Sequence, residues 1–298
     1  MKYRKLGKSS LEVSVISFGG MSMPVDQPIA DQLISKAVDG GINLFDTADL
    51  YNQGANELML GKALKSYRKK VFIATKVGNQ WRPDNSGWDW NPSKQYIISQ
   101  VENSLQRLGT DYIDLYQLHG GTIDDPIDET ISAFEELIQK GKIRFYGISS
   151  IRPNVIREYV QRSSISSVMM QYSLLDRRPE ELCLPLLAAS DIGVLARGSI
   201  AKGLLGGKPA DKFLNYDKLE VHKLSTAIRS ISSDGRSEMQ TSVNYVLQQQ
   251  AVTSAVIGVR TMAQLDEALA VPETLALTAQ ELAYLNQILH QNFYEEHR

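Results

Sequence analysis

The strongest constraint on the fold is an alternation, repeated eight times, of a short apolar run with a longer segment of helical periodicity. Short apolar runs bounded by turn residues predict buried strands, and strands that alternate with helices predict a parallel sheet. The predicted strands are residues 15–18, 43–45, 71–74, 114–118, 144–148, 168–171, 193–196 and 254–257. The predicted helices are residues 29–38, 57–64, 93–108, 128–138, 153–160, 179–189, 237–249 and 262–269. Eight such units in 298 residues indicate an α/β fold, a (β/α)8 TIM barrel that occupies residues 1–298 as a single domain.

Segments at both ends of the chain extend this barrel. Residues 3–6 and 11–13 flank the polar turn 7–10, which predicts an N-terminal β-hairpin. Residues 278–291 follow the last strand–helix unit and predict an additional C-terminal helix.

Two longer segments lack a clear period. Residues 78–92 contain three tryptophans and are predicted to be an unpaired loop. Residues 197–235 are predicted to be a long connection, of the kind that often serves as a functional lid. A doubly wound sheet is the alternative fold, but it usually carries Gly-x-Gly-x-x-Gly after the first strand. The segment 18–23 lacks the third glycine, so the barrel is favoured.

Composition narrows the class of protein. The formal net charge is −2, so no basic surface is expected to bind nucleic acid. The single cysteine, Cys183, excludes an intramolecular disulfide and fits a reducing compartment. Residues 1–11 show no signal-peptide pattern, and no run approaches the ~18 apolar residues of a membrane span. The expectation is a cytoplasmic protein without a membrane partner, either a monomer or a weak homo-oligomer.

Polar residues stand where three consecutive predicted strands end. Asp46, Lys76 and His119 follow the second, third and fourth strands, and Tyr51 lies in the loop after the second. Active-site groups of a (β/α)8 barrel come from the carboxyl ends of different strands. Because neighbouring strands lie about 4.8 Å apart, these side chains are expected to converge.

The residue types suit proton delivery to a carbonyl oxygen. An ammonium group close to Tyr51 would favour the phenolate and make this tyrosine a better acid; Lys76 can supply that charge. Asp46 can act as counter-ion to the buried lysine, and His119 can donate a hydrogen bond that orients a substrate oxygen. Taken singly, each residue also has an ordinary structural interpretation. Asp46 could form a turn or a helix cap, and Tyr51 could simply be a packed ring. Lys76 could extend its side chain to the surface, and His119 could be a hydrogen-bonded core histidine. Their joint occurrence at strand ends favours the functional interpretation.

These residues resemble the aldo-keto reductase family over nearly the whole chain, and the chain looks most similar to the bacterial NADPH-dependent members. The most specific motifs are Asn43–Tyr51 (Asn-x-x-Asp-Thr-Ala-x-x-Tyr), Ala74–Lys76 and Asp111–His119. The resemblance implies that Asp46, Tyr51, Lys76 and His119 match the family's catalytic tetrad, with Tyr51 as general acid. It also implies that NADPH binds across the barrel mouth without a Rossmann fold.

The resemblance implies nicotinamide contacts at the ends of later strands. Ser149 matches a ligand of the carboxamide. The family usually has a glutamine three residues before the tyrosine of the sixth strand, where this chain has Met169. Gln171 lies two residues on and faces the same way along a strand, so it is expected to substitute, with Met169 as the alternative. Arg197 stands where relatives often carry a stacking aromatic residue, and it is expected either to stack on the nicotinamide or to meet the pyrophosphate.

Two later segments match the family's cofactor-phosphate sites. The loop over the pyrophosphate corresponds to Gly198, Ser199, Ala201 and Lys202, whose backbone N–H groups could bind anionic oxygens. The adenosine-phosphate site corresponds to Gly258, Arg260, Gln264 and Glu267. Arg260 is the expected ligand of the 2′-phosphate, because a fork of donors suits a phosphate, and this favours NADPH over NADH. The alternative for Arg260 is a solvated loop cation.

The expected function is NADPH-dependent reduction of small aldehydes or ketones to alcohols. An alternative is a nucleotide-binding redox-sensing or regulatory barrel with slow turnover. A metal-dependent barrel hydrolase is not favoured, since the chain has only four histidines and no clustered ligand spacing, and no metal site is predicted. The segment that bears Trp81, Trp88 and Trp90 is expected either to form a wall of the substrate pocket or simply to pack against the barrel.

Overall fold

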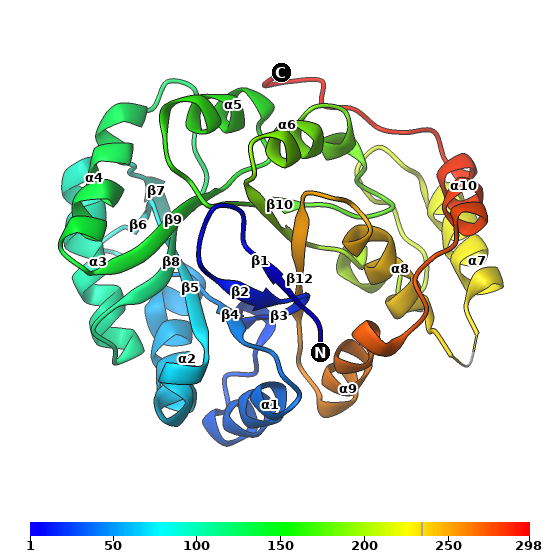
Figure 1. Cartoon of the computed structure of the whole chain (residues 1–298), viewed down its shortest axis with the longest axis horizontal. Helices are drawn as coiled ribbons and strands as arrows, with labels where there is room; N and C mark the ends of the chain where they lie inside the picture. Colours follow the sequence, from blue (N-terminus) through cyan, green and yellow to red (C-terminus); the bar gives the residue numbers. More distant parts are fainter. Residues whose placement is uncertain (234) are drawn as a thin grey trace.

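The computed structural model describes residues 1–233 and 235–298 and forms a closed barrel of eight parallel strands. Around the barrel the strands follow the order β10-β11-β12-β3-β4-β5-β8-β9. Their bounds are β3 Ile16–Gly19, β4 Leu44–Asp46, β5 Phe72–Val77, β8 Ile113–Leu118, β9 Ile143–Ser149, β10 Ser167–Gln171, β11 Gly193–Arg197 and β12 Val252–Gly258. The predicted (β/α)8 barrel is therefore confirmed, and Figure 1 shows it in a view along the barrel.

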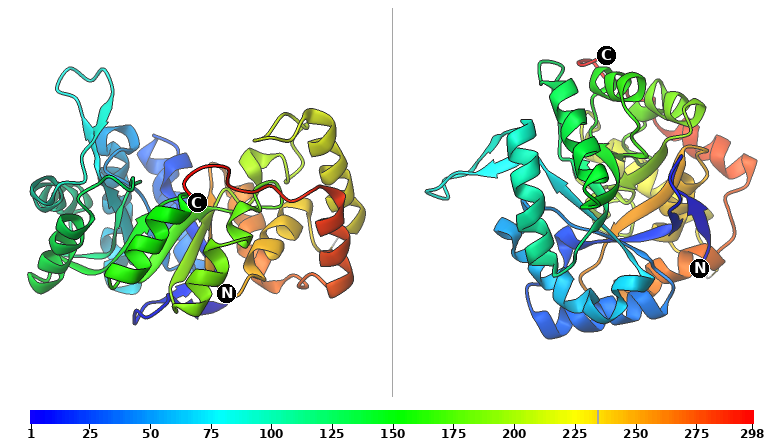
Figure 2. Two further views of the ribbon diagram at one scale, coloured as in Figure 1. Left: turned by 90° about the horizontal axis from the view of Figure 1, so that it is seen from above. Right: turned by 60° about the vertical axis from the view of Figure 1, so that its left-hand side comes forward.

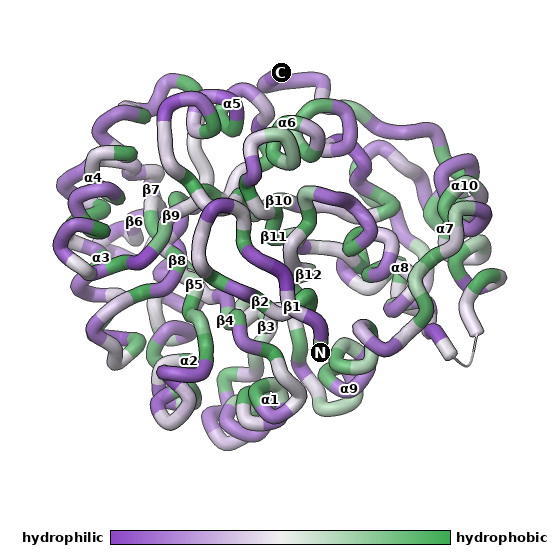
Figure 3. Tube along the Cα trace, in the orientation of Figure 1, coloured by the Kyte–Doolittle hydropathy of each residue, from purple (hydrophilic) through white to green (hydrophobic). Residues whose placement is uncertain are grey.

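Helices surround the barrel on the outside (Figure 1). Their bounds are α1 Gln27–Asp39, α2 Ala55–Leu64, α3 Lys94–Leu108, α4 Ile127–Gln139, α5 Pro153–Arg162, α6 Cys183–Ala189, α7 Lys218–Ile231, α8 Glu238–Leu247, α9 Met262–Ala270 and α10 Ala279–Ile288. Short 3-10 turns occupy Gly20–Ser22, Tyr51–Gly54, Lys65–Lys70, Arg178–Glu180, Ala201–Gly203 and Val271–Glu273. Along these helices apolar and polar residues alternate, as the colours of Figure 3 show, and the apolar positions of helices such as α1 and α4 are buried.

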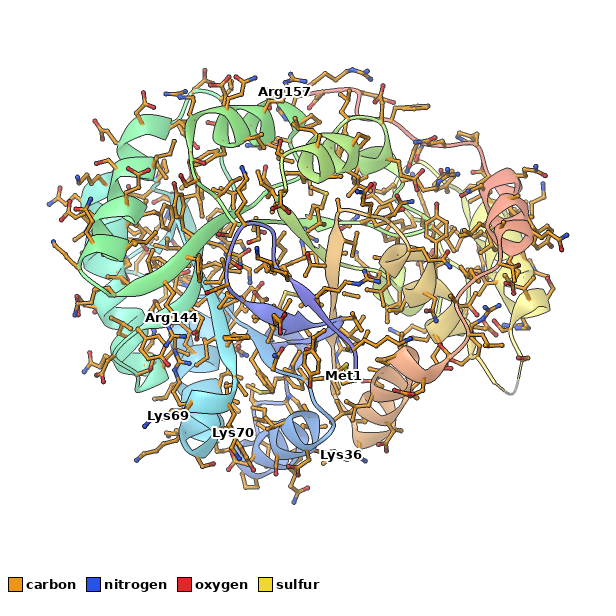
Figure 4. The ribbon with its side chains drawn as sticks, in the orientation of Figure 1. Met1, Lys36, Lys69, Lys70, Arg144 and Arg157 are labelled. Carbon is orange, nitrogen blue, oxygen red and sulfur yellow. The ribbon has the colours of Figure 1, made fainter. Side chains whose placement is uncertain are left out.

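The ring of helices is closed where α1 contacts α9. Lys36 of α1, labelled in Figure 4, forms an ion pair of 2.5 Å with Asp266 of α9. Both side chains are largely exposed, so this pair adds little to stability. None of the helices in the described part of the chain is long and apolar enough to cross a membrane.

Two apolar clusters hold the fold together. The larger one lies between the strands and the surrounding helices. The smaller one fills the barrel interior and includes Leu44, Ala74, Leu115, Met169, Leu195 and Val256. The N-terminal hairpin, formed by β1 (Tyr3–Lys5) and β2 (Glu12–Ser14), adds Leu6, Leu11 and Val13 to this interior cluster. The predicted hairpin is thus present, and it closes one end of the barrel (Figure 1).

The segment that was expected to be an unpaired loop is a second hairpin. β6 (Asn79–Trp81) and β7 (Trp88–Trp90) pair antiparallel, with Trp81 opposite Trp88. Arg82, which follows β6, forms a bidentate ion pair with Asp89 of β7. The sequence prediction was wrong because the polar turn between the strands dominates the local composition. In the left view of Figure 2 this hairpin projects beyond the helices at the end of the barrel opposite the N-terminal hairpin.

The long connection after the seventh strand also contains a regular element. Helix α7 begins at a capping box in which Asp217 and Glu220 bond each other's backbone N–H groups. Val221, Leu224 and Ile228 are its buried positions, at helical spacing. The prediction of an irregular 197–235 was therefore wrong for residues 218–231, and the missed signal was the Asp-x-x-Glu cap. The expected additional C-terminal helix is α10, which packs beside α7 (Figure 1).

Two predicted helices differ in detail. Residues 179–189 form a 3-10 turn at Arg178–Glu180 and a separate short helix α6, because Leu182 between them is not helical. In α2 the apolar spacing was misleading: Leu58 is exposed, whereas Glu57 beside it is fully buried. This buried carboxylate belongs to the candidate site.

Candidate active site

A buried lysine–aspartate pair lies at the ends of two adjacent strands. Asp46 is the last residue of β4, and Lys76 lies near the end of β5. Lys76 Nζ donates to both Asp46 carboxylate oxygens at 2.7 Å and to the Thr47 carbonyl oxygen at 2.7 Å. Lys76 is 0% and Asp46 4% exposed, so the pair is removed from water. Two charges buried this deeply require the close, fully bonded geometry that is observed.

Tyr51 and His119 complete the group. Lys76 Nζ lies 3.4 Å from Tyr51 Oη and 5.0 Å from the centre of the Tyr51 ring. The Tyr51 and His119 rings meet edge to face, with centroids 5.8 Å apart. His119 extends the β5–β8 ladder, because its N–H donates to the Val77 carbonyl oxygen at 2.7 Å. The structure therefore brings together the four residues that were predicted to converge.

The protonation states of Lys76 and His119 are set by their burial and by the charges of the residues around them. Burial alone would lower the pKa of Lys76, but the attraction of Asp46, and then that of Tyr51, outweighs burial and raises this pKa. Lys76 is therefore an ammonium. Burial lowers the pKa of His119 to about 3, and the positive charges of Lys76 and Arg197 act in the same direction. His119 is thus an uncharged imidazole at neutral pH.

The loop that carries Tyr51 is held by hydrogen bonds from residues that the sequence analysis did not predict. Asn56 accepts a hydrogen bond from Thr47 Oγ1 at 2.7 Å and donates to the Gly20 carbonyl oxygen at 2.9 Å. Asn52 and Gln53 adopt the left-handed backbone conformation, with φ of 49° and 55°, so the chain turns sharply after Tyr51. Polar residues at the start of an otherwise apolar helix were the available signal for this support.

A buried acidic pair lies beside this loop. Glu57 accepts from Thr75 Oγ1 and from Arg107 Nε, each at 2.6 Å. Asp49 is also buried, and its Oδ1 has no hydrogen-bond partner among the described residues. Burial, reinforced by repulsion from Glu57, raises the pKa of Asp49 to about 8. Asp49 therefore titrates near neutral pH, within two residues of Tyr51.

The Trp90 ring packs against the backbone that follows Lys76 and against the backbone that follows His119. Gly78 follows β5 and Gly120 follows His119, both with positive φ. A Cβ at Gly78 would lie 2.7 Å from the Trp90 ring, and one at Gly120 would lie 3.2 Å from it. Trp90 Nε1 donates to Asp125 Oδ1 at 2.9 Å, which fixes the ring in this place. The two glycines let the indole pack directly against the chain next to His119.

The predicted nicotinamide ligands lie at the ends of β9, β10 and β11. Gln171 and Arg197 are register partners, and Arg197 Nη1 donates to Gln171 Oε1 at 3.2 Å. Gln171 Nε2 donates to Asp176 Oδ2 at 2.8 Å. Met169 belongs to the interior apolar cluster, whereas Gln171 reaches a partly exposed position. Ser149, the last residue of β9, pairs in register with Met169.

The predicted phosphate loop has an unusual backbone. Gly198, Ala201 and Lys202 have φ of 71°, 45° and 59°, and Lys202 is exposed. A Cβ at Gly198 would lie 3.3 Å from Gln171 Cγ. Ser199 is buried, and its Oγ has no partner in the described chain. Non-glycine residues in the left-handed conformation are uncommon, so Ala201 and Lys202 mark this loop as a candidate for a functional role.

The predicted adenosine-phosphate residues lie around the start of α9. Gln264 Oε1 accepts from the Arg260 backbone N–H at 2.9 Å, and the exposed Arg260 guanidinium has no ion pair among the described residues. Gly258, at the end of β12, is held against Ser22, because a Cβ there would lie 2.6 Å from Ser22 Oγ. Glu267 is one turn further along α9, where its carboxylate accepts from Ser237 Oγ. The structure thus joins Arg260 to Gln264 and directs Glu267 toward α8.

Comparison with known proteins shows the family to which the chain belongs. The family model described as "Aldo/keto reductase family" matches residues 15–290. The chain belongs to the aldo/keto reductase family. The "Uncharacterized oxidoreductase YqkF" of Bacillus subtilis (strain 168) is 48% identical over the whole of both chains. "Aldo-keto reductase YhdN" of the same organism is 31% identical over 97% of this chain and 94% of its own.

A solved structure of another family member is similar throughout. The holo form of aldo-keto reductase AKR11C1 from Bacillus halodurans is 48% identical, covers 100% of this chain and 99% of its own, and has a TM-score of 0.94. The apo form of that protein, with the same coverage, has a TM-score of 0.86. The chain is therefore an oxidoreductase of a family whose members use nicotinamide cofactors.

Proposed function

We propose that this protein is an NADPH-dependent cytoplasmic reductase of small aldehydes or ketones, acting as one barrel domain. The observation that carries the proposal is the position of Lys76 Nζ, held by both oxygens of Asp46 and 3.4 Å from Tyr51 Oη. An ammonium fixed beside a phenol stabilises the phenolate that remains after the proton has been given away. That arrangement suits a general acid and has no evident structural purpose.

The residues of this chain divide the reaction between them. Tyr51 donates its proton to the carbonyl oxygen, and Lys76 stabilises the resulting phenolate. His119, uncharged, donates a hydrogen bond to the same oxygen and orients the substrate. When NADPH is bound, it supplies the hydride for the carbonyl carbon. Trp90, which packs against Gly78 and Gly120, forms the wall of the substrate site beside His119.

The residues at the barrel mouth fit a nicotinamide dinucleotide. Ser199 Oγ, buried and without a partner in the described chain, and the exposed Arg197 and Lys202 offer donors for the pyrophosphate. Ser149 and Gln171, at the ends of β9 and β10, are the proposed ligands of the nicotinamide carboxamide. Arg260 lacks a carboxylate partner among the described residues, so its guanidinium can take a 2′-phosphate. The higher similarity to a holo form than to the apo form of a relative supports a cofactor-binding arrangement.

The test of the proposed acid is Tyr51→Phe, assayed by NADPH oxidation with a panel of aldehydes, diketones and sugars. We expect kcat to fall by about 10²–10⁴-fold, the usual contribution of general acid–base catalysis. Tyr67→Phe is the matched control, because Tyr67 Oη bonds Ser35 Oγ on the outside of the barrel. Full activity of Tyr51→Phe would contradict the assignment. Slow turnover by the wild type, with tight NADPH retention and a co-purifying partner, would instead favour a regulatory barrel.

The test of nucleotide preference is Arg260→Ala. Loss of one charge-assisted bidentate contact is expected to weaken NADPH binding by about 10–100-fold and to leave NADH binding nearly unchanged. Quenching of tryptophan fluorescence by each nucleotide measures both affinities. An equal loss for the two nucleotides would contradict the role of Arg260 at the 2′-phosphate.

A further inference from the structure

Inside the barrel, next to Lys76, lies a polar side chain that the reaction scheme does not use. Gln117 of β8 is fully buried, and neither its Nε2 nor its Oε1 has a hydrogen-bond partner among the described residues. Ser167 of β10 is fully buried too, and its Oγ also has no partner there. Buried polar atoms are almost always hydrogen-bonded, so each of these two side chains calls for a physical explanation.

The strand register shows where Gln117 points. It is the register partner of Lys76, whose Nζ lies inside the barrel mouth. Leu115, two residues earlier on the same strand, belongs to the interior apolar cluster. The β5–β8 ladder continues to His119, whose N–H bonds the Val77 carbonyl oxygen. Because side chains two apart on a strand share a face, Leu115, Gln117 and His119 point inward in succession.

The strand between Gln117 and Ser167 carries no side chain at this register position. On the other side from Lys76, the register partner of Gln117 is Gly147, which in turn pairs with Ser167. A Cβ at Gly147 would lie 2.5 Å from Ser167 O and Oγ, so the serine packs directly against the glycine backbone. The register row beside Lys76 therefore carries an amide and a hydroxyl with only a glycine between them.

His119 presents a complementary requirement. Its Nδ1 is buried and has no hydrogen-bond partner in the described chain. An uncharged imidazole carries one N–H, so if Nε2 donates to a substrate oxygen, Nδ1 has to accept a hydrogen bond. Lys76 does not supply this donor, because its N–H groups are directed to Asp46 and to the Thr47 carbonyl oxygen.

We propose that Gln117 is the positioning residue for His119: its amide binds one bridging water that donates to Nδ1, and so holds the imidazole in the tautomer that carries its proton on Nε2. The catalytic consequence rests on the proposed function, whereas the hydrogen bond itself does not. An amide suits this place because it supplies a donor without adding charge beside Lys76. Ser167 Oγ provides a further partner for a bridging water, which typically makes about three hydrogen bonds.

The experiment compares two variants with a matched control. Gln117→Met keeps the length of the side chain and removes both polar atoms, and Gln117→Glu replaces the donor by an acceptor. Tyr116→Phe is the control: Tyr116 is the neighbouring residue on β8, is fully buried, and has a hydroxyl without a partner in the described chain. Its ring packs outward against Phe134 of α4. The 15N chemical shifts of the His119 ring report the tautomer in the full chain, and kcat and KM are measured for one aldehyde.

In the wild type and in Tyr116→Phe we expect the proton to lie on Nε2. In Gln117→Met the tautomers should mix, and in Gln117→Glu the proton should move to Nδ1 or a second proton should bind. Loss of one hydrogen bond to His119 is expected to lower kcat about tenfold in Gln117→Met, with little change in KM. A wild-type tautomer in both Gln117 variants would overturn the proposal. A shifted tautomer in a chain that reduces no carbonyl would support the proposal and contradict the proposed function instead.

Discussion

The two ends of the barrel interior have opposite chemistry, although the same strands build both. On three adjacent strands the inward residue changes from apolar to polar within two positions, from Leu44 to Asp46, from Ala74 to Lys76 and from Leu115 to Gln117. Toward one end the N-terminal hairpin closes the apolar layer. Toward the other, buried charges gather beside Tyr51 and His119.

This difference separates the part of the interior that stabilises the fold from the part that performs chemistry. Burying an apolar side chain is favourable, whereas burying a charge is costly unless it is paired and hydrogen-bonded. The polar layer therefore persists only because each charged member is held by another. Substitutions in the two layers should have different consequences, and the following experiments test that contrast in order of expected effect.

The largest effect is expected for Lys76→Met. It removes the partner of Asp46, which is 4% exposed, and so leaves a buried carboxylate uncompensated. Breaking a buried pair in this way costs about 3–5 kcal/mol of unfolding free energy, and kcat should fall by at least about 10²-fold. Denaturant unfolding and NADPH oxidation measure the two losses. If Lys76→Met kept activity close to that of the wild type, the polar layer would not be the part of the interior that performs the chemistry.

Leu115→Ala tests the apolar layer on the next strand. Truncating a fully buried leucine costs about 2–5 kcal/mol of unfolding free energy. Leu115 belongs to the apolar layer and is separated from His119 by three residues of the chain. The kcat of the folded protein should therefore change by less than about threefold. A loss of activity as large as that of Lys76→Met, at a temperature where the variant is folded, would show that the two layers are not separable.

Asp49→Asn tests the buried carboxyl beside the tyrosine loop through its pH dependence. In the wild type the folded-state pKa of Asp49 is about 8, which is above its unfolded value. The folded state therefore keeps this proton to higher pH than the unfolded state, and the free energy of unfolding falls as pH rises toward 8. His119, whose folded-state pKa of about 3 is below its unfolded value, has the opposite slope, and that slope ends near pH ~6.5. Between pH ~6.5 and 8 the free energy of unfolding of the wild type should fall, relative to that of Asp49→Asn, by up to about 1.4 kcal/mol per pH unit. Parallel stability curves for the two proteins in that window would contradict the burial of an unpaired carboxyl.

The smallest effect is expected for Lys36→Met, the surface counterpart of Lys76→Met. It also breaks a lysine–aspartate pair, but the side chains of Lys36 and Asp266 are 40% and 57% exposed. Such pairs contribute about 0–1 kcal/mol, and activity should not change. A loss comparable to that of Lys76→Met would mean that the ring of helices depends on this contact far more than its exposure suggests.

The sequence could predict the barrel because its strands are short apolar runs at regular intervals. It could not predict the β6–β7 hairpin or α7, whose signals are a polar turn and the Asp217–Glu220 capping box rather than a hydrophobic period. Spacing also failed in α2, where Leu58 is exposed and Glu57 buried. A buried carboxylate is explained only by partners that are distant in sequence, here Thr75 and Arg107.

The same limit applies to the site. Asp46, Lys76 and His119 could be predicted to converge because strand ends of a barrel share one rim. Gln117 stood unnoticed within a predicted strand, since only the register shows that it faces inward beside Lys76. The position of Asn56 depends on the turn after Tyr51, in which Asn52, Gln53 and Gly54 all have positive φ. Two of these three residues are not glycine, so the sequence indicates this turn only in part.

The most direct test of the central claim is a double-mutant cycle of Tyr51→Phe and Lys76→Met on kcat/KM. If the phenol and the ammonium act as one proton-delivering unit, the double variant should be no slower than the slower single variant, because each change alone disables the unit. Losses that multiply in the double variant would show that the two residues act independently and would contradict the claim.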